Sequence, residues 1–164
     1  MLDIHPARVA DQGKIVQLWH RGWHEAHAAL VPPEGLSFRT EGHFAIWLKE
    51  AKDAFYVARD GTELIGFVSV KAAEVVKLYV GTSARGTGTA HALLSFAEQL
   101  LFADGVSEAE LLCTAGNSRA ERFYQREGWH LTDTFDDALW MPKGVSRQFI
   151  VATHRFQKTL IPAT

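Results

Sequence analysis

The spacing of hydrophobic and polar positions changes several times along the chain, and each change marks an expected element. Leu2–Val9 is predicted to form a short strand, and Pro6 within it favours an edge position. Asp11 is then expected to cap a helix whose apolar residues follow a helical spacing. This helix has ended by Pro32-Pro33, because the residue before a proline avoids helical geometry. A second helix is expected over about Phe38–Glu50.

The middle of the chain has the short period of β-strands. Ala54–Arg59 and Glu63–Lys71 flank Asp60-Gly61, a pair that tolerates the backbone of a tight hairpin turn. Glu74–Val80 is rich in β-branched residues, and we expect it to be a further strand.

The second half of the chain alternates between helical and strand patterns. In order, we expect a helix from Thr87 to about Phe102, a strand over Glu110–Thr114, a helix over Asn117–Glu127 and strands over Trp129–Thr134 and Gln148–Phe156. Together these elements predict a mixed α/β (α+β) sheet with helices packed on it. Since no repeat, linker or low-complexity tract interrupts the pattern, a single domain over residues 1–164 is expected.

Composition narrows the class of protein. The chain has 164 residues, of which 47% are hydrophobic and 22% charged, as is usual for globular proteins. A formal net charge of −2 gives no electrostatic reason to expect nucleic acid as a partner. No apolar run reaches the ~20 residues of a membrane span, and the N-terminus lacks the apolar core of a secretion signal. The one cysteine, Cys113, cannot form an internal disulfide. We therefore expect a cytoplasmic protein that acts on a small or peptide-like molecule.

The segment from Val80 to Ala90, rich in glycine and other small residues, lies between an expected strand and an expected helix. Small residues there let a ligand approach the backbone closely, and the free N–H groups of a helix start attract anions. A P-loop would need a lysine that this loop lacks, and a dinucleotide-binding loop would need a small residue where His91 stands. A turn that merely needs glycines is the alternative, and Arg85 favours a phosphate ligand.

Two motifs in this half of the chain resemble those of the GNAT superfamily of N-acetyltransferases. The family pattern Gln/Arg-x-x-Gly-x-Gly/Ala falls on Arg85, Gly88 and Ala90. Its second pattern, Asn-x-x-Ala-x-x-hydrophobic-Tyr-x-x-x-Gly-aromatic, is matched from Asn117 to Trp129. The resemblance implies a mostly antiparallel sheet with helices on both faces, split near its centre to admit coenzyme A.

The resemblance also implies transfer of an acetyl group from acetyl-CoA to an amine by direct attack. It assigns the acyl-CoA site to Leu78, Tyr79, Val80, Arg85, Gly86, Thr87, Gly88, Thr89, Ala90, Asn117 and Tyr124. In the family a backbone N–H of the central strand, here that of Val80, polarises the thioester carbonyl. The asparagine, here Asn117, binds the pantetheine arm.

Two side chains are candidates for moving protons. Tyr124 is expected to protonate the departing thiolate as a general acid; a phenol has a reference pKa near ~10 and a thiol near ~8.5. The alternative is that it only packs in the core. Glu74 is a candidate base for the incoming ammonium, because it is expected to share a strand face with Val76, Leu78 and Val80. An exposed carboxylate without a role is the other interpretation of Glu74.

The first helix carries His20, His24 and His27 on one face. Because this helix usually borders the acceptor pocket in the family, His24, Glu25 and His27 are candidate acceptor contacts. Solvated or packed histidines without a role are the other interpretation. A metal site is disfavoured, since no acidic ligand cluster supports the histidines and the zinc-protease spacing is not met. The acidic positions Asp133, Asp136 and Asp137 could attract a cationic acceptor or lie in a solvated loop.

An acetyl-CoA-dependent N-acetyltransferase without a metal is therefore the function expected from the sequence. A non-catalytic acyl-CoA-binding module on the same fold is the main alternative, and a histidine-based metal hydrolase is a third class. The sequence leaves the amine acceptor open, and a homodimer is compatible with a small enzyme of this kind.

Overall fold

The computed structural model describes residues 1–162. Its strands are β1 (Leu2–Pro6), β2 (Ala54–Asp60), β3 (Glu63–Lys71), β4 (Glu74–Val80), β5 (Glu108–Thr114), β6 (His130–Ala138) and β7 (Ile150–Thr159). Its α-helices are α1 (Gln12–His27), α2 (Glu41–Glu50), α3 (Thr89–Ala103) and α4 (Ser118–Arg126). Short 3-10 helices lie at Val9–Asp11, Pro33–Phe38 and Thr82–Ala84.

All seven strands form one sheet in the order β1-β2-β3-β4-β5-β7-β6. Every neighbouring pair is antiparallel except β4 and β5, which are parallel. The prediction of a mixed, mostly antiparallel sheet is confirmed. The edge position that Pro6 predicted for β1 is confirmed as well.

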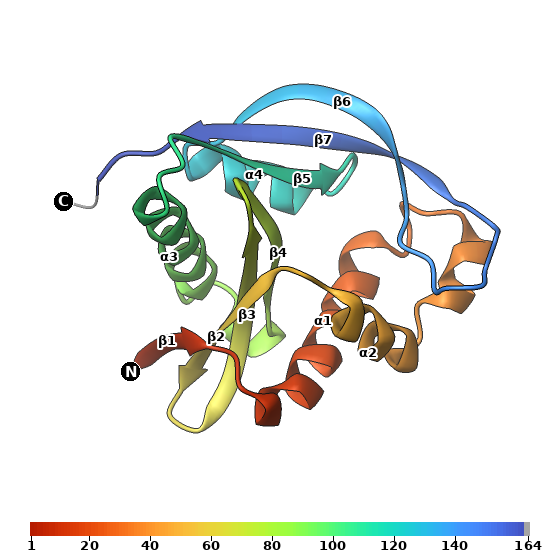
Figure 1. Cartoon of the computed structure of the whole chain (residues 1–164), viewed down its shortest axis with the longest axis horizontal. Coiled ribbons are helices and arrows are strands. Elements are labelled where there is room, and N and C mark those ends of the chain that lie inside the picture. Colours follow the sequence, from red (N-terminus) through yellow and green to blue (C-terminus); the bar gives the residue numbers. More distant parts are fainter. Residues whose placement is uncertain (163–164) are drawn as a thin grey trace.

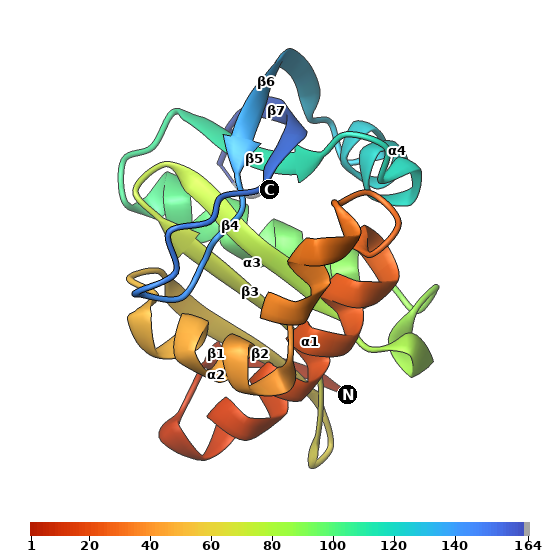
Figure 2. The ribbon, with the colours of Figure 1, turned by 90° about the vertical axis from the view of Figure 1, so that its right-hand side faces the viewer.

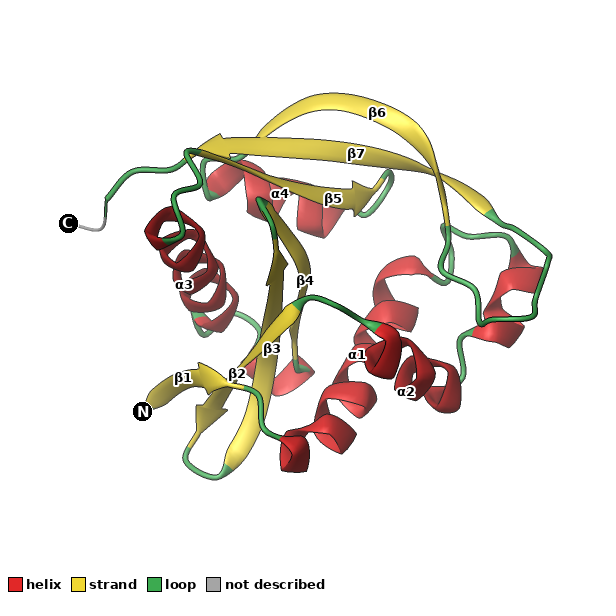
Figure 3. Cartoon of the chain, in the orientation of Figure 1, coloured by secondary structure: helices red, strands yellow, loops and turns green. Residues whose placement is uncertain are grey.

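Helices cover both faces of this sheet. Helices α1 and α2 lie on one face of β2–β4 and α3 lies on the other, as Figure 2 and the secondary-structure colours of Figure 3 show. Each face has its own hydrophobic core. Leu93, Leu94 and Phe156 belong to the core on the α3 side, whereas Trp19, Phe44 and Phe67 belong to the core under α1 and α2.

The sheet opens at its centre, between β4 and β5. These strands pair only at Glu74–Glu110 and Val75–Leu111, and Figure 1 shows β5 leaving β4 at a steep angle. At the same point the register of β3 and β4 shifts, so that Val76 is a bulge residue without a partner on β3. A bulge bends and twists its strand. The split that the family resemblance implied is therefore present, and it begins one residue after the last β4–β5 pair.

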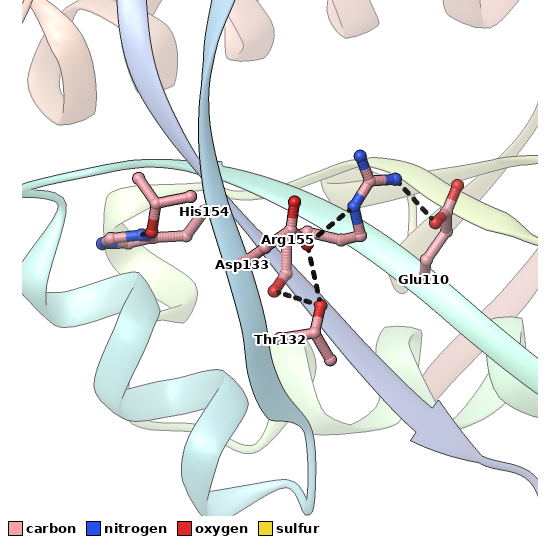
Figure 4. A network of polar contacts seen from close by, with 6 residues as sticks. Glu110, Thr132, Asp133, His154 and Arg155 are labelled. Atoms are coloured by element: carbon pink, nitrogen blue, oxygen red, sulfur yellow. Dashed lines mark hydrogen bonds and ion pairs between the residues drawn. The ribbon is translucent and has the colours of Figure 1, made fainter.

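The three strands beyond the split are tied together by polar side chains (Figure 4). Arg155 of β7 donates to Glu110 of β5 at 3.1 Å and to Asp133 of β6 at 3.0 Å. The Thr132 hydroxyl donates to the Arg155 carbonyl at 3.2 Å. Because one guanidinium bridges both neighbouring strands, β5, β7 and β6 form one unit on the far side of the opening.

Several boundaries differ from the expected ones for local reasons. Helix α2 begins at Glu41 because the Thr40 hydroxyl accepts from the His43 N–H. Asp11 precedes α1 but its side chain does not cap it; the carboxylate accepts from the Arg8 N–H at 2.8 Å and pairs with Arg59. Asp11 is therefore the N-cap residue of α1, as expected, but its side chain makes no cap hydrogen bond because the carboxylate is already occupied.

Candidate functional site

A cavity of about 720 Å³ runs through the opening between β4 and β5. One end is bordered by the loop after β4, the start of α3 and one side of α4. The other end is bordered by α1 and by the ends of β6 and β7. The cavity therefore connects the α3–α4 side of the sheet with the α1 side, as a site for two reactants would require.

The backbone of β4 presents free hydrogen-bond donors to this cavity. The Gly81 N–H donates to the Ile65 carbonyl of β3 at 2.8 Å. Since N–H groups alternate sides along a strand, those of Val80 and Leu78 point away from β3, towards β5. Strand β5 has already separated from β4 at that level. Two N–H groups, rather than that of Val80 alone, are thus positioned to polarise a carbonyl oxygen.

The loop after β4 presents a second set of donors. The N–H groups of Arg85 and Thr87 donate within the loop, to carbonyls of Thr82 and Ala84. Those of Gly86, Gly88, Thr89 and Ala90 make no backbone hydrogen bond among residues 1–162. Gly86 and Gly88 have positive φ angles, of 75° and 85°, which only glycine adopts readily. Four free donors at the positive end of α3 are a suitable site for a phosphate group.

The predicted cofactor residues lie together around the cavity. All of them line it except Thr87, whose hydroxyl donates to the Ala84 carbonyl and contacts the Thr89 hydroxyl. Asn117 also caps α4 through its side-chain oxygen, which accepts from the Ala120 N–H. Its amide NH₂ group is left to donate towards the cavity. Arg85 lines the cavity too, but its guanidinium forms an ion pair with Glu25 of α1.

The Tyr124 side chain lines the cavity close to Cys113. Burial raises the pKa of Tyr124 above its ordinary value, and the neighbouring Cys113 and Tyr79 raise it further. The phenol is therefore protonated at neutral pH and able to donate. Among residues 1–162 no side-chain partner is recorded for its hydroxyl, which leaves it free for a ligand.

Proton transfer from a phenol to a thiolate is an uphill step in water. A phenol at its reference pKa is a weaker acid than a thiol by roughly 1.5 units, so protonating a thiolate costs free energy in water. Burial raises the pKa of Cys113, which lines the same cavity, to about 12. A thiolate bound beside it would be desolvated in the same way, which offsets the rise that burial causes in the pKa of Tyr124.

The α1 end of the cavity is lined by Gly22, Ala26 and His27, facing Asp137 and Leu139. Burial lowers the pKa of His27 to about 4, so its ring is neutral at pH 7. Its Nδ1 lies 3.1 Å from the Trp23 carbonyl and therefore carries the proton, which leaves Nε2 as an acceptor. The Asp137 carboxylate accepts only from the Ala138 N–H, at 3.0 Å, among residues 1–162.

Two of the three predicted acceptor contacts lie elsewhere. His24 is absent from the cavity lining, and its Nε2 donates to the Arg39 carbonyl at 2.7 Å. Glu25 faces a second cavity of about 610 Å³ and is paired with Arg85. Only His27 lies at the α1 end of the main cavity. The helical spacing placed the histidines on one side of α1 but could not tell which of them faces the opening.

Glu74 does not line the cavity either. The bulge at Val76 reverses the alternation of side chains along β4, so that Val75 packs with Leu78 and Val80 on the α3 side. Glu74 therefore shares a face with Lys77. The predicted face was wrong because the bulge at Val76 could not be predicted from the sequence. Burial raises the pKa of Glu74, and its pairing neighbour Glu110 adds to this.

No group of three or more His, Cys, Asp or Glu side chains that could hold a metal ion occurs within residues 1–162. Over the same residues, no helix is both long enough and apolar enough to cross a membrane.

The family model of the acetyltransferase (GNAT) family matches residues 15–129. The chain belongs to the GNAT acetyltransferase family. The match runs from residue 15, within α1, past the end of α4, and hence includes the split strands and both motifs that carried the resemblance. A search of curated proteins gives no significant match for this GNAT chain.

Solved GNAT structures share the fold. A GCN5-related N-acetyltransferase from Rhodopseudomonas palustris is 18% identical, with a TM-score of 0.74 over 96% of this chain and 95% of that one. The PaiA N-acetyltransferase of Thermoplasma acidophilum, solved with coenzyme A, is 18% identical, with a TM-score of 0.69 over 97% and 99%. The ribosomal-protein-alanine N-acetyltransferase of Brucella melitensis is 17% identical, with a TM-score of 0.71 over 96% and 99%. At these identities the likeness shows the fold alone.

Two residues of this GNAT domain, Lys77 and Arg39, were not singled out from the sequence. Lys77 lines the cavity and forms a buried ion pair with Asp53, at 2.8 Å. Its signal was a charged residue inside the apolar strand EVVKLYV. Arg39 follows a 3-10 helix that the sequence pattern did not reveal.

Proposed function

We propose that this protein is an N-acetyltransferase that moves an acetyl group from acetyl-CoA to a primary amine by direct attack. The observation that carries the proposal is the cavity through the split sheet, with free N–H groups of β4 at its middle and free N–H groups of the glycine loop at one end. This donor arrangement fits an acyl thioester joined to a pyrophosphate.

Acetyl-CoA, when bound, would supply the acetyl thioester. The free N–H groups of Gly86, Gly88, Thr89 and Ala90 would hold the pyrophosphate. Arg119 and Arg126 of α4 border the same end of the cavity. The amide of Asn117 would donate to the pantetheine arm. The N–H groups of Leu78 and Val80 would stabilise negative charge as it develops on the carbonyl oxygen.

Tyr124 would donate its proton to the departing sulfur, since its hydroxyl lies in the cavity and is neutral. Two carboxylates are candidates for accepting the proton of the incoming ammonium. Glu74 was the candidate from sequence, and it would have to act from outside the cavity lining. Asp137 lies in the lining at the α1 end, and its position favours it for this role.

The alternative function is a module that binds acyl-CoA without catalysis. Tyr124 and Asp137 favour the enzyme, because a binding module needs neither a neutral phenol beside the sulfur nor a carboxylate at the opposite end of the cavity. The amine acceptor of the proposed reaction would enter from that opposite end, between α1 and β6.

The experiment has two arms. In the first, coenzyme A should raise the thermal midpoint, and Gly88→Ala should weaken this shift, because a side chain is strained at the φ of 85°. Gly61→Ala is the matched control, since Gly61 also has a positive φ but lies in the β2–β3 turn. In the second arm, an amine library is screened for thiol release from acetyl-CoA. Stabilisation by coenzyme A without transfer to any amine would favour the binding module.

A further inference from the structure

The Arg39 guanidinium is buried without an anionic partner. Arg39 is only 1% exposed. Of its three side-chain nitrogens, only Nη1 makes a hydrogen bond, to the Phe38 carbonyl at 3.1 Å. Nε and Nη2 have no partner among residues 1–162. An unpaired buried charge is costly, so most such groups in proteins are paired.

Three tryptophan rings surround this guanidinium. Its Cζ atom lies 5.0 Å from the ring centre of Trp23, 5.1 Å from that of Trp47 and 5.7 Å from that of Trp140. Trp140 is stacked on Trp47, with ring centres 5.0 Å apart and 4° between their planes. Ring faces attract the positive charge, but they leave the N–H groups at the edge of the guanidinium without acceptors.

Lys77, the second cation of this aromatic core, has the carboxylate partner that Arg39 lacks. Lys77 lies over Trp47 as well, and its ammonium pairs with Asp53 at 2.8 Å. For Arg39, burial lowers the pKa to about 10, and no carboxylate opposes this change. The group is still a cation at neutral pH. The core under α1 and α2 therefore holds one more positive charge than negative charge.

The unpaired charge lies directly behind the α1 end of the main cavity. The Trp23 ring under Arg39 has its centre 5.2 Å from that of His27, which lines the cavity. The charge of Arg39 adds to the lowering of the His27 pKa and opposes the rise in that of Tyr79, another lining residue. Leu139, which also lines the cavity, immediately precedes Trp140, another of the three rings around Arg39.

We propose that the acceptor amine carries a carboxylate, and that Arg39 pairs with it. This inference rests on the proposed function, since it names the substrate class of the same site. A guanidinium presents paired N–H groups that match the two oxygens of a carboxylate. Arg39 does not line the cavity in this structure, so pairing requires its side chain to turn past the Trp23 ring and to give up its one hydrogen bond, to the Phe38 carbonyl. Asp137 at the same end would receive the ammonium, so a small amino acid-like molecule fits both charges.

The first test measures binding and needs no turnover. Wild-type protein saturated with free coenzyme A is titrated calorimetrically with the common amino acids and with their α-carboxamides. The carboxamides keep the amine and the side chain but lack the negative charge. We expect at least one amino acid to bind tenfold or more tightly than its carboxamide.

The second test removes the guanidinium. Arg39→Met keeps an unbranched apolar chain among the tryptophans and leaves no buried charge. We expect it to abolish the preference for the carboxylate, to leave coenzyme A affinity within twofold and to raise or maintain the thermal midpoint. Arg147→Met is the matched control, because Arg147 lies over Phe149 in the neighbouring loop and should keep the preference.

The outcomes separate the two proposals. Equal binding of acids and carboxamides by the wild type overturns the role of Arg39, even if amines are acetylated. A preference for carboxylates that survives in Arg39→Met also overturns it. A lower midpoint together with weaker coenzyme A binding in Arg39→Met indicates a structural role instead. If carboxylates bind preferentially in the wild type but not in Arg39→Met, and no amine is acetylated, the pairing of Arg39 with a carboxylate stands and the proposed catalytic function fails.

Discussion

The guanidinium of Arg85 is paired with the carboxylate of Glu25, which joins the glycine-rich loop to α1. Both side chains are about one third exposed, at 35% and 37%. An exposed pair of this kind contributes about 0.2–1 kcal/mol. A phosphate of coenzyme A that binds the Arg85 guanidinium must compete with the Glu25 carboxylate. Glu25→Gln is therefore expected to tighten coenzyme A binding by about two- to fivefold, measured by calorimetry.

Arg85→Gln should have the opposite effect and weaken coenzyme A binding by about tenfold or more, because a charged hydrogen bond to phosphate is lost. Glu41→Gln is the control, since Glu41 lines the same second cavity as Glu25 without pairing to Arg85. Weaker binding in Glu25→Gln would show that the pair orients the arginine rather than competing for it.

Replacing Tyr124 by Phe tests the acid role. The variant keeps the ring that packs near Phe156 and loses only the hydroxyl. Coenzyme A affinity should change by less than threefold, while kcat should fall by roughly 10²-fold, as expected when general acid catalysis is removed. Tyr56→Phe is the control, because Tyr56 packs against Phe96 and is not part of the cavity lining. A wild-type kcat in Tyr124→Phe would leave the phenol with a packing role only.

The base can be assigned by comparing two carboxylates. Asp137→Asn is expected to lower kcat/KM by roughly 10²-fold at neutral pH. The deficit should shrink as pH rises, because the amine then loses its proton to solvent. Glu74→Gln should follow this pattern only if Glu74 is the base, and Asp136→Asn, one residue from Asp137, serves as the control. A full pH profile of kcat/KM with the best amine decides between them.

The raised pKa of Glu74 leads to a prediction about how stability depends on pH. Because burial and Glu110 raise the pKa of Glu74 in the folded protein, the folded state binds its proton more tightly than the unfolded state. Its stabilising contribution is therefore present at acid pH, below the unfolded pKa, and is lost as pH rises through the folded pKa. Glu74→Gln should raise the thermal midpoint at pH 7 by roughly 1–3 °C. The gain should disappear near pH 4, and the exposed Glu108→Gln should show none.

The sequence predicted those parts of the fold that short-range patterns determine. The hairpin around Asp60-Gly61 is confirmed. It could be predicted because its turn and both of its strands are formed by residues adjacent in the sequence. The same holds for the helix that follows Asn117 and for the glycine loop between β4 and α3. The face of Glu74 could not be predicted, because the bulge at Val76 depends on how β4 pairs with β3. Arg39 was missed for a similar reason, since its three tryptophans come from separate elements.

A sheet normally leaves its backbone donors and acceptors unpaired only along its two outer edges, here β1 and β6. The separation after Val75 gives this sheet two inner margins as well, along the far parts of β4 and β5. The amides of Leu78 and Val80 should thus exchange with deuterium more readily than those of Phe67 or Tyr79, although all four lie near the middle of the protein. An extended ligand with alternating carbonyl and N–H groups can fill that gap as an additional strand would, and slow the exchange.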